Sequence, residues 1–247
     1  MAIRERLNLA VSTLRVDSLQ AQACRRQQAR CAHQPLPMAP SLRLTYFDFM
    51  GRAEPIRLAL SIGGVPFQDE RLTLNDFAAL KPSLPFAQLP VIDVGGESLA
   101  QAPAILRYAG KLSGLLPRDP IAAMRADEII FAVQDAIADF GPSTAEREAA
   151  RRLEMRRALA AETLPGRLEM IERRIRGRGT EYCAGEEMTV ADLSVYCFFR
   201  VMRGGDGALE GIPTGLVDAY EEICAVCGRV EAHPKVREWN DAHRKGE

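Results

Sequence analysis

The sequence has no long apolar run, few cysteines and little net charge, and each shortage excludes a class of protein. Its apolar runs are far shorter than the ~20 residues of a membrane-spanning helix, so we expect a soluble chain with no membrane partner. A net charge of −1 over 247 residues gives no reason to expect nucleic acid as a partner. Six scattered cysteines are too sparse for a disulfide scaffold, which favours a reducing compartment.

Signatures of phosphate and metal chemistry are also missing. Neither "GGDG" nor "GRG" precedes a Lys-Ser/Thr pair or follows a strand, so no glycine-rich phosphate loop is expected. Cys224 and Cys227 form a C-x-x-C pair, but it falls in a helical stretch with no second pair. None of the three histidines stands beside a nucleophile or a second metal ligand. We therefore expect no metal.

The first forty residues lack lysine and hold only two acids against six arginines. Their net charge of +4 leaves −5 for the remainder of the chain. "AIRERLNLAVSTLRV" carries its apolar side chains on one helical face, and such an Arg-rich, amphipathic start is typical of an organellar transit peptide. A disordered extension over 1–40 is the alternative. "HQPLPMAP" then predicts an extended linker, and the globular part should begin near Leu42.

The next seventy residues alternate strand and helix patterns. "LRLTYF" has the two-residue period of a strand, and the following helix has Pro55 in its first turn. A polar, edge-like strand, a strand beginning at "LPVIDV", a "GG" hairpin turn and a last helix follow. The expected elements are strand 42–47, a helix ending at 63–64, strand 66–74, strand 89–94, strand 97–100 and helix 102–112. This β-α-β then β-β-α order predicts a thioredoxin-like domain over 41–113.

Beyond a linker at 113–120, the period changes to 3.6 and predicts an all-helical domain over 121–247. Pro165 and Gly166 should interrupt the second helix. "TVAD" has the form of a capping box, which we interpret as structural. The expected helices are 121–142, 146–176, 190–203, 216–227 and 234–243. The predicted fold class is therefore an α/β domain followed by an all-α domain.

Tyr46 is the first candidate for chemistry. It ends the first strand, where its hydroxyl would point at the start of the following helix, whose unpaired N–H groups favour an anion. A thiolate fits there as well as a phosphate, and a nearby Arg52 could favour the charged form. From these residues alone, a plain core role for Tyr46 stays open.

Three segments in the first half resemble the cytosolic glutathione S-transferases. They are "LTYFDFMGRAEPIR", "SLPFAQLPVIDV" and "QAPAILRYAG", and they stand at the spacing of that family. The likeness extends to the tyrosine-using, sigma-type branch that includes the glutathione-dependent prostaglandin D synthases. It runs from about Leu42 to the C-terminus, with looser matches at "MTVADLSVY" and "HPKVREW". Residues 1–40 lie outside it.

The resemblance implies a role for each matching residue. Tyr46 would stabilise the glutathione thiolate, and Arg52 would support that geometry. Pro90 would be the cis-proline that turns the backbone of Leu89 toward the cysteinyl part of glutathione. The other implied contacts are Phe77 and Lys81 at the glycyl end, Gln101 and Ala102 at the γ-glutamyl end, and Asp135, which reaches the ligand of the neighbouring subunit. Gln88 stands where close relatives often carry lysine or glutamine. The implied partners are glutathione, a small apolar electrophile and a second copy of the chain.

Ala102 departs from the family, which has a serine there whose hydroxyl holds the γ-glutamyl carboxylate. Its absence predicts weaker glutathione binding, because a hydrogen bond to a charged group is worth about 1.5–3 kcal/mol. The leading function is a glutathione transferase enzyme in the cytoplasm, or in an organelle if residues 1–40 are a transit peptide. The alternatives are a glutathione-dependent isomerase or peroxidase, and a non-catalytic binding or structural protein with this fold.

Overall fold

The computed structural model describes residues 41–204 and 209–243. They lie in one compact unit that spans Ser41–Glu247. The expected transit peptide or disordered extension at 1–40 lies outside the described residues.

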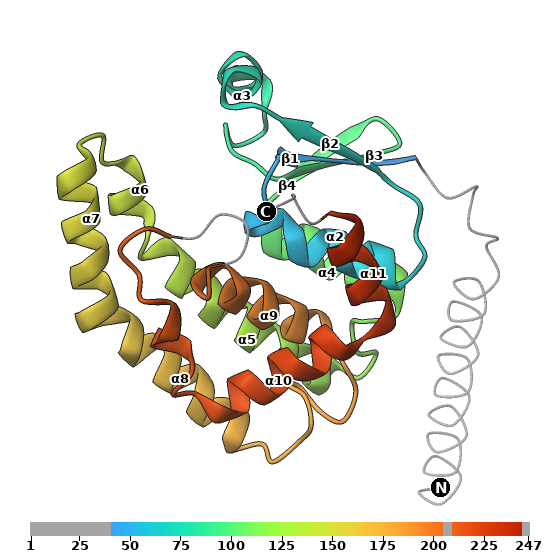
Figure 1. Cartoon of the computed structure of the whole chain (residues 1–247). Helices are drawn as coiled ribbons and strands as arrows, with labels where there is room; N and C mark the ends of the chain where they lie inside the picture. The colour runs from blue at the N-terminus through green and yellow to red at the C-terminus, as the bar shows by residue number, and fades with distance from the viewer. Residues whose placement is uncertain (1–40, 205–208, 244–247) are drawn as a thin grey trace, which may run out of the picture. The chain divides into compact units, whose positions relative to one another are not determined.

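A four-stranded mixed sheet, in the order β2-β1-β3-β4, forms the first part of this unit (Figure 1). β1 pairs in parallel with β2 and antiparallel with β3, and β3 and β4 form a hairpin around Gly95 and Gly96. The strands are β1 Leu42–Phe47, β2 Gln68–Leu72, β3 Val91–Val94 and β4 Glu97–Ala100. β2 lies at an edge of the sheet, which confirms the prediction from its polar sequence.

Helices lie on both sides of the sheet. Those of this part are η1 Gly51–Ala53, α2 Glu54–Ile62, α3 Leu74–Leu80, η2 Lys81–Ser83 and α4 Ala102–Ser113, of which η1 and η2 are 3-10 turns. α2 and α4 lie side by side on one face, and α3 lies on the opposite side of the sheet (Figure 1). α3 was not predicted: the strand expected over 66–74 ends at Leu72, because Thr73 caps α3 in a capping box with Asp76.

The second part is helical, as predicted. Its elements are α5 Pro120–Ala138, α6 Gly141–Ala145, α7 Ala149–Ala158, the π-helical turn η3 Leu159–Thr163, α8 Leu164–Arg176, α9 Val190–Met202, the 3-10 turn η4 Thr214–Val217, α10 Glu221–Ala232 and α11 Pro234–Ala242. α9 is buried along almost its whole length and packs against α5 and α10. α11 returns to pack on α2, so the C-terminal helix touches the first part of the unit (Figure 1).

Three predicted helices differ in their bounds, and the one expected over 146–176 begins at Ala149. The helix expected over 121–142 ends at Ala138, and a separate short helix follows with Pro142 in its first turn. The helix expected over 216–227 runs from Glu221 to Ala232, because η4 and a short turn occupy the residues before it. The interruption predicted near Pro165 is confirmed by the π-helical turn that precedes it.

Candidate active site

Tyr46 is the next-to-last residue of β1 and points its hydroxyl at the turn that starts the next helix. Its side chain is 6% exposed. The hydroxyl oxygen accepts a hydrogen bond from the backbone N–H of Arg52, in η1, at 3.1 Å. The Arg52 N–H lies in the first turn, where a helix has no internal acceptor for it. The phenol oxygen supplies that acceptor, which leaves the phenol proton available to another acceptor.

Gly51 allows this close approach. A Cβ at Gly51 would lie 2.5 Å from the Tyr46 hydroxyl oxygen and 2.8 Å from the Phe49 ring. Its φ of +44° is also in the left-handed region that other residues rarely adopt. Both the contact and the backbone angle therefore require glycine.

The surroundings of Tyr46 keep its phenol protonated. Burial raises its pKa above the usual value of 10.0, and the Arg52 N–H together with the Arg52 and Arg57 charges offsets only part of this effect. Because the pKa of Tyr46 is raised overall, its hydroxyl is neutral at physiological pH. A neutral, buried hydroxyl is a hydrogen-bond donor to an anion.

Aromatic side chains surround the exit of β1. Phe47 lies edge-on to Tyr46 at 5.3 Å between ring centroids and to Phe77 at 5.2 Å. The Lys81 ammonium lies 5.8 Å from the centre of the Phe77 ring, within reach of a cation–π contact. Phe49 is 43% exposed and stacks on Phe47. Phe47 thus contacts both Tyr46 and Phe77, and Lys81 lies beside Phe77.

A pocket beside this site gathers most of the other predicted residues. The Leu89-Pro90 peptide bond is cis, as the resemblance implied, and Gln101 has a φ of +78° just before α4. Ala102 is the first residue of α4, where its N–H has no helical partner. The residues lining the pocket are Arg52, Phe86, Gln88, Leu89, Pro90, Ala100, Gln101, Ala102, Pro103 and Gln134. Six of the ten predicted site residues therefore share one pocket.

The other four predicted residues lie outside it. Tyr46, Phe77 and Lys81 belong to the neighbouring aromatic cluster. Asp135 is exposed on α5, one residue after Gln134, which lines the pocket.

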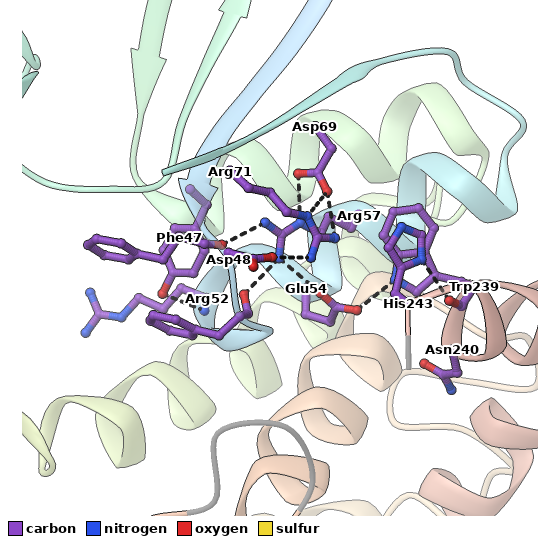
Figure 2. Close-up of polar contacts among 12 residues, drawn as sticks. Phe47, Asp48, Arg52, Glu54, Arg57, Asp69, Arg71, Trp239, Asn240 and His243 are labelled. Atoms are coloured by element: carbon purple, nitrogen blue, oxygen red, sulfur yellow. Dashed lines mark hydrogen bonds and ion pairs between the residues drawn. The ribbon is translucent and has the colours of Figure 1, made fainter. Parts of the chain in front are cut away.

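Sequence reasoning missed a buried ionic network behind Tyr46 (Figure 2). Arg57 of α2 is fully buried and pairs with Glu54 at 3.2 Å and with Asp69 at 2.9 Å. Trp239 of α11 donates its indole N–H to Glu54 at 2.8 Å. The available signal was an arginine inside the apolar stretch "PIRLAL", which a core helix tolerates only when the charge is paired.

The described residues form neither a cluster of metal ligands nor a membrane-spanning helix. No group of three or more His, Cys, Asp or Glu side chains there could hold a metal ion. No helix within 41–204 or 209–243 has the length and apolar character needed to cross a membrane.

Comparison with known proteins agrees with this arrangement. Family profiles of the glutathione S-transferase N-terminal and C-terminal domains match residues 42–111 and 134–243. Glutathione S-transferase 1 of Ascaris suum is 31% identical over 203 residues, which cover 81% of this chain and 95% of that protein. Hematopoietic prostaglandin D synthase of Gallus gallus is 28% identical over 81% and 95% of the two chains. The structure of prostaglandin synthase D of Nilaparvata lugens superposes with a TM-score of 0.74, at 29% identity over 84% and 100%.

A thioredoxin-like domain with a cis-proline, followed by an all-helical domain, defines a two-domain class of protein. Within that class, the chain belongs to the glutathione S-transferase family, in the branch of the sigma-class enzymes and hematopoietic prostaglandin D synthases.

Proposed function

We propose that the protein is a glutathione transferase in which Tyr46 activates the glutathione thiol for attack on a small, apolar electrophile. The observation that carries the proposal is the buried, protonated Tyr46 hydroxyl, which accepts the Arg52 N–H at 3.1 Å and keeps its own proton to donate. Family membership supports glutathione as the co-substrate.

The chemistry asked of Tyr46 is the lowering of a thiol pKa. A free thiol ionises near pH 8.5, so only a small fraction is nucleophilic at neutral pH. A hydrogen bond donated to the thiolate favours the charged form, and each unit of pKa shift corresponds to about 1.4 kcal/mol. The thiol proton leaves to solvent and the thiolate sulfur forms a bond to the electrophilic carbon. The bond from that carbon to the leaving group breaks, and the leaving group departs with its electron pair.

The neighbouring pocket would hold the cysteinyl and γ-glutamyl parts of the tripeptide. The Leu89 backbone would bind the cysteinyl part like an added strand, and Lys81 beside Phe77 would meet the glycyl carboxylate. The other proposed contacts are Gln101 and the N–H of Ala102 at the γ-glutamyl end, together with Gln88. The division into a glutathione-binding part at 41–113 and a substrate-binding part at 121–247 belongs to this proposal, as does a cytoplasmic location.

We also propose a homodimer, in which Asp135 reaches the γ-glutamyl amine bound to the other copy. Asp135 shares one face of α5 with Phe131 and Met124, which are 53% and 59% exposed. Phe86, 61% exposed, lines the same pocket as Gln134 and so lies at the edge of that face. An exposed apolar patch beside a ligand pocket is typical of an interaction surface.

Substitution Tyr46→Phe tests the proposal, because it removes only the hydroxyl. We expect kcat for conjugation of a standard aromatic electrophile to fall about 100-fold, while the Kd for glutathione changes little. Equal activity of the two proteins would show that the hydroxyl does not activate the thiol.

Assays of the wild-type protein distinguish two kinds of alternative, which are another glutathione-dependent enzyme and a non-catalytic protein. Prostaglandin synthases among the relatives favour an isomerase that uses the same thiolate, and peroxide reduction is a second use of it. Ala102, which lacks a hydroxyl for the γ-glutamyl carboxylate, favours a non-catalytic binding protein. A panel of electrophiles, peroxides and endoperoxides distinguishes these functions, and failure to turn over any of them favours the non-catalytic protein.

A further inference from the structure

The Arg57 guanidinium holds the main chain that follows Tyr46. Its Nη1 donates to the carbonyl oxygen of Phe49 at 2.9 Å, and its Nη2 donates to that of Phe47 at 3.1 Å. These two carbonyls lie on either side of the turn that leaves β1. The guanidinium carbon is also 5.7 Å from the centre of the Tyr46 ring. Arg57 therefore touches the tyrosine and the segment that sets its direction.

Acidic side chains in turn fix Arg57. Glu54 of α2 and Asp69 of β2 pair with it, and Asp69 also pairs with Arg71 at 2.8 Å. On the side of α9, burial raises the pKa of the Cys197 thiol well above its usual range, so this neighbour adds no charge. The buried cation thus faces Glu54 and Asp69, and Glu54 has a partner in the C-terminal helix.

That partner is Trp239 of α11. Its indole N–H donates to Oε1 of Glu54, while Oε2 of Glu54 receives Arg57 (Figure 2). One carboxylate therefore joins the C-terminal helix to the arginine. The neighbouring Asn240 makes a different connection, because it donates to the Tyr196 hydroxyl at 2.8 Å and accepts from Arg200, both on α9.

We infer that Arg57 is a positioning residue for the Tyr46 hydroxyl, and that Trp239, acting through Glu54, makes the C-terminal helix part of the thiol-activating site. The inference rests on the proposed function. Arg57 anchors the carbonyls of Phe47 and Phe49, and their positions set where the Tyr46 hydroxyl and the η1 turn meet the sulfur. Small displacements of a reacting group cost large factors in rate.

Trp239→Phe tests the link, because phenylalanine keeps an aromatic ring against Phe67 and His243 but has no N–H for Glu54. We expect kcat/KM near neutral pH to fall about 3- to 10-fold with little change in the Kd for glutathione. The apparent pKa in the pH profile of kcat/KM should rise, because the thiolate is less well stabilised. Arg57→Lys keeps the charge but replaces a planar fork that makes four hydrogen bonds by three donors on one nitrogen, and it should lower kcat/KM about 100-fold.

Asn240→Ala is the matched control, since it loosens the same helix without touching Glu54. It should lower thermal stability and leave the pH profile where it is in the wild type. If Trp239→Phe lowers only stability, or if Asn240→Ala shifts the profile equally, the inference is wrong.

A readout without glutathione separates this inference from the proposed function. The Tyr46 phenol is titrated by ultraviolet absorbance in the free protein, as the difference from the matching Tyr46→Phe variant. Trp239→Phe should raise the phenol pKa further, because the Arg57 charge that lowers it is less well held. An unchanged phenol pKa overturns the inference even if the wild type is a transferase. A wild type with no activity but a shifted phenol pKa overturns the proposed function alone.

Discussion

At the scale of single residues, the site depends on how closely two groups approach the Tyr46 hydroxyl. Gly51 leaves the space for that oxygen, and the backbone N–H of Arg52 donates a hydrogen bond to it. Ala102 leaves a different space, at the first turn of α4, where its small side chain is 7% exposed. The site can therefore be tested by adding one methyl group at Gly51 or one hydroxyl group at Ala102.

Gly51→Ala should disable the site. The new Cβ would lie 2.5 Å from the Tyr46 oxygen, so the hydroxyl must move, and a displacement of about 1 Å can cost 100-fold in kcat/KM. Gly64→Ala is the control, because Gly64 has a similar φ of +62° but open space around it. If both variants lose the same activity, backbone strain rather than the contact with Tyr46 explains the loss.

Ala102→Ser should tighten glutathione binding. A serine hydroxyl at this first helical position adds a hydrogen bond to the γ-glutamyl carboxylate, so we expect Kd to fall about 10- to 100-fold by calorimetry. Ala104→Ser, at an exposed position of the same helix, should change nothing. An unchanged Kd in Ala102→Ser would mean that the carboxylate binds elsewhere.

At the scale of elements, local signals in the sequence predicted most of the fold. The period of β1, the Gly95-Gly96 turn and the capping box of α9 are short-range patterns, and the structure confirms them. α3 was missed, because the polar stretch after β2 reads equally as a continued strand until Thr73 caps it. The hydrogen bond from Trp239 to Glu54 joins residues 185 positions apart, and no local sequence pattern predicts such a contact.

Capping boxes of α9 and α3 provide a matched pair for a stability test. Asp192 is fully buried and accepts from the N–H groups of Thr189 and Cys183, both at 2.7 Å. Asp192→Asn removes one acceptor oxygen there, so we expect a loss of about 2–4 kcal/mol in the free energy of unfolding.

Asp76→Asn makes the same change in the exposed box of α3, where water replaces the lost acceptor. The loss in the free energy of unfolding, measured by chemical denaturation, should be clearly smaller than that of Asp192→Asn. Equal losses in the two variants would show that burial does not set the value of the cap.

At the scale of the whole molecule, the proposed dimer accounts for the exposed apolar side chains of α5 and the loop before Pro90. Phe131→Glu places a charge on that face, and it should convert a dimer to a monomer in sedimentation velocity. Glutathione affinity should fall with it, because Asp135 of one copy serves the other. Met170→Glu, at a 49% exposed position of α8, is the control and should leave the assembly unchanged. A wild-type monomer would contradict the dimer.

The central claim concerns one hydrogen bond, from the Tyr46 hydroxyl to a glutathione sulfur. Its most direct measurement is a pH titration of the bound thiolate by ultraviolet absorbance, in the wild type and in Tyr46→Phe. We predict that the bound thiol ionises at least about one pH unit below its free value of 8.5 in the wild type, and near 8.5 in the variant. Because the pKa of Tyr46 is raised, its hydroxyl stays a donor throughout this range. The same thiol pKa in both proteins would contradict the account.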